Sequence, residues 1–540
     1  MVQLQGKGTG GGVAVGSVYL LRKGEGQIPM HRTEDPAGEL RQLEAALQTA
    51  REQLGRLYES ARERAGEESA QVFQIHQMML EDEDYLEAIR DAVTQEGCNV
   101  QWAVSKASQM FSQMFSSMED AYMRERAADV EDISRRLLRI LSGSGDAGIR
   151  FDAPVILAAE DLSPSETVQL DQEKILAFLT EKGSDNSHTA ILARTMGIPA
   201  VVGVSRLLKA VEQGMEAGVD GDSGTVWLSP DSAVLETLGE KAALQREQKR
   251  RLARLRGLPA QTQSGRRMML YANIGGVEDV QAALSNDAEG VGLFRTEFLY
   301  LQSRTYPTEE EQFAVYRKVV QGMDGRRVIF RTLDIGADKQ ADYFQLEAEE
   351  NPAMGVRAIR ICLERPDLFR TQLRAIYRAG AYGPVGIMFP MITSLWELRE
   401  AKAHCEAVRQ ELIEEGIPVA EKAEIGVMIE TPAAALISGT LAAHVDFFSI
   451  GTNDLTQYTL ALDRQNSKAG RFYDPHHPAV LELIRISAKA AHEGGAWCGI
   501  CGELAADLSL TEQFLDWGID ELSVSPGGIL PLKETIRSLP

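Results

Sequence analysis

Residues that could bind a small anion or a metal ion recur where strands are predicted to end in the C-terminal half of the chain. They are Asn273, Arg295, Arg331, Glu430, the pair Asn453 and Asp454, and Cys501. Guanidinium groups bind carboxylates and phosphates through paired hydrogen bonds, and carboxylate oxygens are the ligands that Mg²⁺ takes from proteins. Charged caps on solvent-facing strand ends do not explain so many such positions, and we therefore predict an active site along this edge.

The alternation of strands and helices in residues 265–540 determines where those side chains meet. Strands are expected near 268–273, 289–293, 327–332, 385–390, 424–429, 445–450, 496–500 and 520–524. Strands separated by helical segments in this way are typical of a (β/α)8 barrel of the TIM type, in which active sites lie at the carboxyl ends of the strands.

A second candidate site surrounds His188, within the run GSDNSHTAILAR at residues 183–194. A strand is expected to end at Thr180 and a helix to begin about Ser187, which places His188 in the first helical turn. Free N–H groups there favour an anion, so a phosphorylated imidazole would be stabilised. Neutral imidazole, with an ordinary pKa of about 6.5, is also a competent nucleophile near neutral pH. On the local pattern alone, a histidine that merely caps a helix explains the run equally well.

Cys498 and Cys501 form a C-x-x-C pair, a spacing that also occurs in redox and zinc sites. No second pair lies at zinc spacing, and no thioredoxin-like context surrounds this one. His76 is expected at the edge of a helical core, and His476 and His477 are expected in a surface turn without metal spacing.

The rest of the chain divides by composition into further domains. Residues 1–22 and 144–230 are predicted to form one small α/β domain, interrupted by a helical bundle at 23–143 and followed by a linker helix at 231–258 and the barrel at 259–540. After a first helix near Pro36, the bundle is expected to hold helices at 68–80, 83–96, 99–117 and 120–142. The glycine-rich run 6–12 is interpreted as a turn and not as a dinucleotide loop, because no strand precedes it.

The composition of the chain limits the kinds of partner that it is expected to bind. The formal net charge is −23, which makes nucleic acid and anionic membranes unfavourable partners. No run of about 18 apolar residues is present, so no membrane insertion is expected. Five cysteines are too few for a disulfide scaffold, and a reducing, cytoplasmic location is expected.

Several motifs carry a resemblance to a known family. Residues 187–194, followed by Gly197-Ile-Pro-Ala-Val-Val-Gly203, resemble the phosphohistidine signature of enzymes that use phosphoenolpyruvate (PEP), with Ser184 and Asn186 where the family usually has glycine and threonine. Further similar runs lie at 161–167, 290–300, 330–339, 351–360, 426–433, 446–458 and 498–505. Together they resemble enzyme I of bacterial PEP-dependent sugar phosphotransferase systems over essentially the whole chain.

The resemblance implies a PEP–protein phosphotransferase. PEP would phosphorylate His188, which would pass the group to a histidine of the phosphocarrier HPr as the first step of sugar uptake, with release of pyruvate. Mg²⁺ would bind to Glu430 and Asp454, and Cys501 would protonate the enolate. The residues implied to bind PEP are Arg295, Arg331, Arg357, Asn453 and Arg464.

The resemblance also implies that HPr docks on the helical bundle, that the α/β domain swings between the barrel and HPr, and that the barrel forms a homodimer. Two other interpretations compete with it. A regulatory homologue would bind PEP or HPr without catalysis. Pyruvate phosphate dikinase and PEP synthase share the phosphohistidine and barrel parts but also need an ATP-grasp domain, for which this sequence shows no nucleotide loop.

Overall fold

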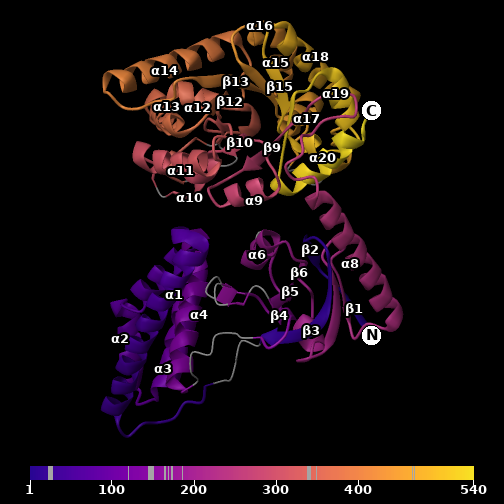
Figure 1. Ribbon diagram of the computed structural model, residues 1–540. Coiled ribbons are helices and arrows are strands. Elements are labelled where there is room, and N and C mark those ends of the chain that lie inside the picture. Colours follow the sequence, from indigo (N-terminus) through magenta and orange to yellow (C-terminus); the bar gives the residue numbers. More distant parts are fainter. Residues whose placement is uncertain are drawn as a thin grey trace. The chain divides into compact units, whose positions relative to one another are not determined.

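The computed structural model divides the chain into two compact units, Met1–Gln248 and Lys249–Pro540 (Figure 1). It describes residues 1–21, 28–118, 121–143, 151–162, 166–167, 170–171, 174–184, 187–303, 305–336, 342–347, 349–464, 466 and 469–540. The side chains of residues 60–71, 121–125, 188, 191, 195 and 342 lie outside that description.

Four helices form a bundle in the first unit: α1 (Pro36–Met79), α2 (Glu83–Gln95), α3 (Val100–Ser116) and α4 (Ala121–Leu141). Aspartate caps begin the first two, because Asp35 accepts a hydrogen bond from the Gly38 N–H and Asp82 accepts one from the Tyr85 N–H, both at 2.9 Å. The apolar faces of the helices meet in one buried core.

The prediction of a separate helix that begins at residue 68 is wrong. Helix α1 runs unbroken through that position. No proline interrupts it, and an isolated glycine lowers helix stability by only about 1 kcal/mol.

An eight-stranded sheet forms the α/β part of the first unit, in the order β1-β8-β7-β3-β4-β5-β6-β2. Its strands are β1 (Val2–Gln5), β2 (Lys7–Gly10), β3 (Val13–Leu21), β4 (Val155–Ala159), β5 (Ile175–Thr180), β6 (Ala200–Val202), β7 (Glu216–Asp220) and β8 (Thr225–Leu228). Strands β3 and β4 pair directly although the helical bundle separates them in sequence. The predicted insertion of the bundle into an α/β domain is therefore confirmed.

The glycine-rich run belongs to this sheet. A Cβ atom on Gly8 would lie 2.1 Å from the Gly221 carbonyl oxygen, so the glycine permits two backbone segments to approach. The turn interpretation is therefore wrong, because strand β1 precedes the run and residues 7–10 of the run form strand β2. Strand β3, and not a helix, follows it.

The second unit is a closed barrel of eight parallel strands, in the order β10-β11-β12-β13-β14-β15-β16-β9, as predicted. They are β9 (Met269–Ile274), β10 (Val291–Arg295), β11 (Val328–Arg331), β12 (Val385–Phe389), β13 (Ala423–Ile429), β14 (Phe447–Ile450), β15 (Trp497–Ile500) and β16 (Glu521–Val524). A small apolar cluster fills the barrel interior, and a much larger one lies between the strands and the outer helices. The barrel therefore presents one rim formed by the carboxyl ends of all its strands.

Helix α8 (Ser232–Ala253) crosses the boundary between the two units. The segment that follows it is fastened to the barrel, because the buried Lys533 of α20 (Ile529–Ser538) donates a hydrogen bond to the Leu258 carbonyl at 2.8 Å. Asp287 accepts a hydrogen bond from the Gly257 N–H at 2.8 Å and pairs with the same lysine.

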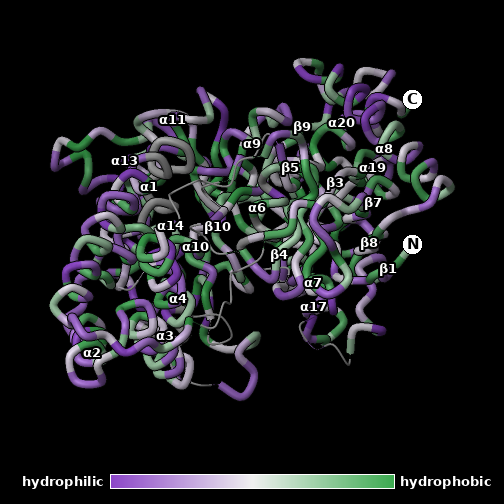
Figure 2. The backbone as a smooth tube through the Cα atoms, turned by 90° about the horizontal axis from the view of Figure 1, so that it is seen from below, coloured by the Kyte–Doolittle hydropathy of each residue, from purple (hydrophilic) through white to green (hydrophobic). Residues whose placement is uncertain are grey.

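Hydrophilic residues recur along the long helices (Figure 2). Within the described part of the chain, no helix combines the length and the apolar character that crossing a bilayer requires.

Candidate active site

The carboxyl ends of the barrel strands bring together the polar residues that the sequence singled out. Arg295 and Arg331 end β10 and β11, and Glu430 directly follows β13. Asp454 lies in the first turn of α17 (Thr452–Leu460), just beyond β14, and Cys501 follows β15. Because the strands are parallel, all these positions lie on one rim.

Arg331 is the centre of a buried ionic network. Its guanidinium contacts Glu297 Oε1 at 2.6 Å and Asp334 Oδ2 at 2.8 Å, and Arg357 approaches the other oxygen of Asp334 at 3.5 Å. Burial alone would lower the pKa of Arg331, but the carboxylates of Asp334, Glu297 and Glu430 raise it above its usual value. The guanidinium therefore stays charged and its orientation is fixed before any ligand binds.

Glu430 is a buried carboxylate with a second carboxylate nearby. Its side chain is 1% exposed, and its Oε1 accepts a hydrogen bond from the Met391 N–H at 2.6 Å. Burial, together with Asp454 and Asp334, raises the pKa of Glu430 well above its usual value. Asp454 itself lies 3.6 Å from a guanidinium nitrogen of Arg464.

Glu430 and Asp454 are near enough for the charge of Asp454 to raise the pKa of Glu430. A cation between them would relieve the charge that raises the pKa of Glu430, and Mg²⁺ usually takes one or two protein carboxylates plus water and substrate oxygens. No three His, Cys, Asp or Glu side chains in the described segments gather into a cage that would hold a metal ion alone. The donor set thus suits an ion that also needs ligands from a bound substrate.

Two residues beside the site have left-handed backbone conformations. Ala358, directly after Arg357, has φ = 52°, and Met391, which donates to Glu430, has φ = 58°. Such conformations are disfavoured for residues with a Cβ atom and tend to cluster at functional sites. Here they belong to the two segments that place a guanidinium and a backbone donor at the rim.

Cys501 lies inside the mouth of the barrel as a thiol. It is 4% exposed and packs with Leu293, Met388 and Met428 in the interior cluster. Burial is the main cause that raises the pKa of Cys501 to about 12, while the nearby Ser449 hydroxyl lowers it. A buried thiol of this kind keeps its proton at neutral pH.

The neighbouring Cys498 has a different environment. It belongs to the large outer cluster, whereas Cys501 belongs to the interior one, and both are free thiols. Strand residues three positions apart point to opposite faces. The C-x-x-C spacing therefore does not bring the two sulfur atoms together as a redox pair.

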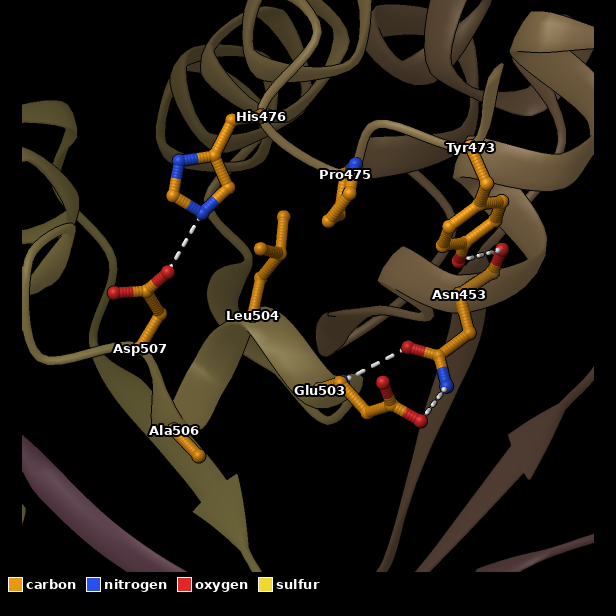
Figure 3. Close-up of a pocket in the computed structure, with 8 residues that line it drawn as sticks. All are labelled: Asn453, Tyr473, Pro475, His476, Glu503, Leu504, Ala506 and Asp507. Atoms are coloured by element: carbon orange, nitrogen blue, oxygen red, sulfur yellow. Dashed lines mark hydrogen bonds and ion pairs between the residues drawn. The ribbon is translucent and has the colours of Figure 1, made fainter. Parts of the chain in front are cut away.

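A small pocket adjoins Asn453, with a volume of about 310 Å³ (Figure 3). Asn453 and Glu503 exchange two hydrogen bonds, of 3.0 and 2.9 Å. Across the pocket, His476 pairs with Asp507 at 2.6 Å. The surface turn predicted for His476 is confirmed, and this histidine holds a loop next to the rim.

Two further histidines that the sequence singled out, His477 and His76, have structural partners. His477 begins α18 (Pro478–Glu493) by accepting a hydrogen bond from the Ala479 N–H at 3.2 Å. His76 is 2% exposed and lies 3.1 Å from Asp129, so the predicted placement against the helical core is confirmed.

Arg295 and Arg464 are the more exposed cations of the rim. Arg295 has an exposed side chain, and among the described residues no acid lies within ion-pair distance of it. The side chain of Arg464 is 39% exposed. Both are therefore accessible to an anionic ligand, in contrast to the buried Arg331.

His188 is the first residue of α6 (His188–Met196) in the first unit. Ser187 caps this helix by accepting a hydrogen bond from the Ala190 N–H at 3.4 Å, and Gly197 ends it with a left-handed conformation, φ = 64°. The predicted position in the first turn is confirmed. The imidazole itself and Asn186 lie outside the described residues.

Sequence reasoning missed Glu297 and Asp334, the acidic partners of Arg331, and Glu503, the partner of Asn453. Glu297 is two residues beyond Arg295, and Asp334 is three beyond Arg331, so both lie within motifs already recognised. Their spacing after an arginine at a strand end was the available signal.

A closed parallel barrel whose carboxyl rim carries arginines and acidic side chains defines a class of protein, the (β/α)8 barrels with a polar rim suited to an anionic ligand. Three family models match successive parts of the chain: PEP-utilising enzyme, N-terminal (5–126), mobile domain (151–224) and PEP-binding domain (249–540). The chain therefore belongs to the PEP-utilising enzymes, in the family of the phosphoenolpyruvate-protein phosphotransferases.

Curated relatives carry that name. The protein of Priestia megaterium is 42% identical over 538 residues, covering 99% of this chain and 94% of its own. The protein of Bacillus subtilis strain 168 is 40% identical, covering 100% of this chain and 95% of its own. A solution structure titled Enzyme I is 30% identical and covers 45% of this chain and 99% of its own, with a TM-score of 0.40.

Proposed function

We propose that this chain transfers a phosphoryl group from PEP to its own His188 and then to a histidine of HPr, and releases pyruvate. This would be the first step of sugar uptake by a phosphotransferase system in the cytoplasm. The observation that carries the proposal is the rim on which fixed guanidinium groups lie near the carboxylates of Glu430 and Asp454. The names of the curated relatives support the same activity.

The rim has suitable partners for both charged groups of PEP. Arg331 and Arg357 offer guanidinium groups held by Asp334, and Arg295 and Arg464 add exposed ones. Paired N–H donors of this kind match phosphate and carboxylate oxygens. Asn453 adds an amide at the same end of the barrel.

Glu430 and Asp454 would hold Mg²⁺, which would neutralise charge on the phosphate oxygens. The enolate that leaves phosphorus needs a proton on its methylene carbon. The thiol of Cys501 is inside the barrel mouth and protonated at neutral pH, so it is suited to donate one. Fixed dipoles and charges would provide most of the rate, as is general for phosphoryl transfer.

His188 belongs to the first unit and the rim belongs to the second. Phosphorylation requires that the helix N-terminus of α6 approach the rim, and that it then reach HPr, for which we propose the helical bundle as the docking surface. The free N–H groups of the first turn would stabilise the phosphohistidine. We also propose that the barrel units associate into a homodimer.

Incubation of the full chain with Mg²⁺ and phosphate-labelled PEP tests the proposal. We expect acid-labile label on His188 and release of pyruvate, no label in a His188→Ala variant, and loss of labelling when the metal ion is removed by a chelator. A folded chain that takes no label from PEP would support a regulatory homologue instead. Label that comes from ATP would support a dikinase-like activity.

A further inference from the structure

Asn273 is a rim residue that the proposed mechanism does not use. It is the second-last residue of β9 and half-buried. Its amide nitrogen donates hydrogen bonds to the carbonyl oxygen of Cys501 and to that of Ser523, both at 3.0 Å. The side chain thus crosses β16 and ties the end of β15 to the first strand of the barrel.

A third hydrogen bond fixes the orientation of this amide. The Ser523 hydroxyl, which is fully buried, donates to Asn273 Oδ1 at 2.6 Å. A reversed amide would place its oxygen against two carbonyl oxygens and its nitrogen against a donor, so only one orientation satisfies all the groups. The two donors of Asn273 are therefore committed to the backbone.

The space for this arrangement comes from a glycine. A Cβ atom on Gly292 would lie 2.5 Å from the Ser523 hydroxyl oxygen and 2.6 Å from Glu521 Oε1. A larger residue there would displace the serine that orients Asn273. The position of Cys501 thus depends on side chains from β9 and β16 and on a glycine of the next strand, β10.

The thiol itself has little else to hold it. Its Sγ makes a long hydrogen bond of 3.7 Å to the Ile450 carbonyl, and the Ser449 hydroxyl lies near enough to lower its pKa. The apolar side chains around it restrict its volume but not its direction. The backbone of residue 501 is held on both sides, because its N–H donates to the Ile450 carbonyl at 3.1 Å and its carbonyl accepts from Asn273 at 3.0 Å. This backbone position helps to determine where the sulfur lies.

We propose that Asn273 is a positioning residue for the proton donor Cys501, an inference that rests on the function proposed above. In that step the S–H bond of Cys501 breaks, a C–H bond forms at the methylene carbon of the enolate, and the enolate oxygen becomes the ketone oxygen of pyruvate. The thiolate then recovers a proton from water. A displacement of about 1 Å can slow such a step by roughly 100-fold.

The test separates phosphoryl transfer from protonation in a single turnover of the full chain. Rapid quenching measures the label on His188, and lactate dehydrogenase, which accepts only the keto form, measures pyruvate. For Asn273→Asp, which has the same shape but no donors, we expect pyruvate to lag behind the label by roughly 10- to 100-fold. The KM for PEP should change by less than about 2-fold, since a residue bound to the backbone makes no contact with substrate. Ser523→Ala, a milder change, should produce a smaller lag.

Gln312→Glu is the matched control. Gln312 is a fully buried amide of α11 (Glu309–Gly322) that donates to the Pro307 carbonyl at 3.0 Å and makes no contact with Cys501. The same amide-to-carboxyl change there should lower stability without a lag. A lag in this variant equal to that of Asn273→Asp would overturn the inference, because any buried amide would then have the same effect.

The remaining outcomes distinguish the two proposals. Asn273→Asp without a lag, or with only a raised KM for PEP, would overturn the positioning role alone. Cys501→Ala that releases pyruvate as promptly as the parent chain would remove the donor role and this inference with it. A parent chain that takes no label from PEP would refute the proposed function itself.

Discussion

Replacement of Arg331 by methionine should separate the stability of the barrel from its chemistry. The side chain of Arg331 is 9% exposed, and those of its partners Glu297 and Asp334 are 3% and 9% exposed. Exposed ion pairs contribute about 0–1 kcal/mol, whereas removal of one partner from a buried pair costs about 3–5 kcal/mol. Arg331→Met leaves Glu297 buried without that cation, so we expect the free energy of unfolding to fall by about 3–5 kcal/mol.

A second substitution makes the prediction specific. In Arg331→Met with Glu297→Gln, no ionised carboxylate remains at residue 297, and most of the lost stability should return. Labelling of His188 by PEP should remain defective in both variants, because the guanidinium group is absent. Urea unfolding of the parent chain, the two single variants and the double variant gives the coupling energy directly.

This reasoning has a clear refutation. If the free energy of unfolding of Arg331→Met lies within about 1 kcal/mol of the parent value, the network is not a buried ion pair in solution. If the double variant is no more stable than Arg331→Met, the unpaired Glu297 is not the source of the loss. Domain stabilities of about 5–15 kcal/mol make either result easy to resolve.

Three further predictions concern the fold. Burial alone would raise the pKa of Asp129, but its histidine and arginine neighbours lower it. The residue therefore contributes stability above pH about 4, and this stability is lost as the pH falls through the lowered pKa. Thermal unfolding of Asp129→Asn between pH 2 and 6 should lack that pH dependence. Gly499→Ala would place a Cβ atom 2.0 Å from Glu521 Oε2 and should cost about 1–3 kcal/mol in urea unfolding, whereas Gly439→Ala, with open space, should not destabilise. Lys533→Met should cost on the order of 2 kcal/mol and increase protease cleavage after the linker helix, and unchanged cleavage would argue against the anchor.

The sequence predicted the barrel and its polar rim because both follow from local pattern. Strand-length apolar runs place residues such as Arg331 and Glu430 at strand ends, and parallel pairing then brings those ends to one side. The ionic partners of Arg331 could not be predicted from local pattern, because its contact with Glu297 depends on how β10 and β11 pack. The continuity of α1 was missed for the opposite reason: a weak local break at glycine does not end a helix that tertiary packing supports.

The charges of the rim explain why so many acids accompany its arginines. The four guanidinium groups belong to Arg295, Arg331, Arg357 and Arg464, and four carboxylates lie among them, those of Glu297, Asp334, Glu430 and Asp454. These acids offset much of the positive charge, so the rim is not a general attractor of anions on a chain whose net charge is −23. A ligand such as PEP would have to share Arg331, Arg357 and Arg464 with their acidic partners, and a divalent cation would have to take up the charge of Glu430 and Asp454. On the proposed function, substrate and metal ion would each offset charge that the other brings to the rim, so we expect each to bind more tightly when the other is present.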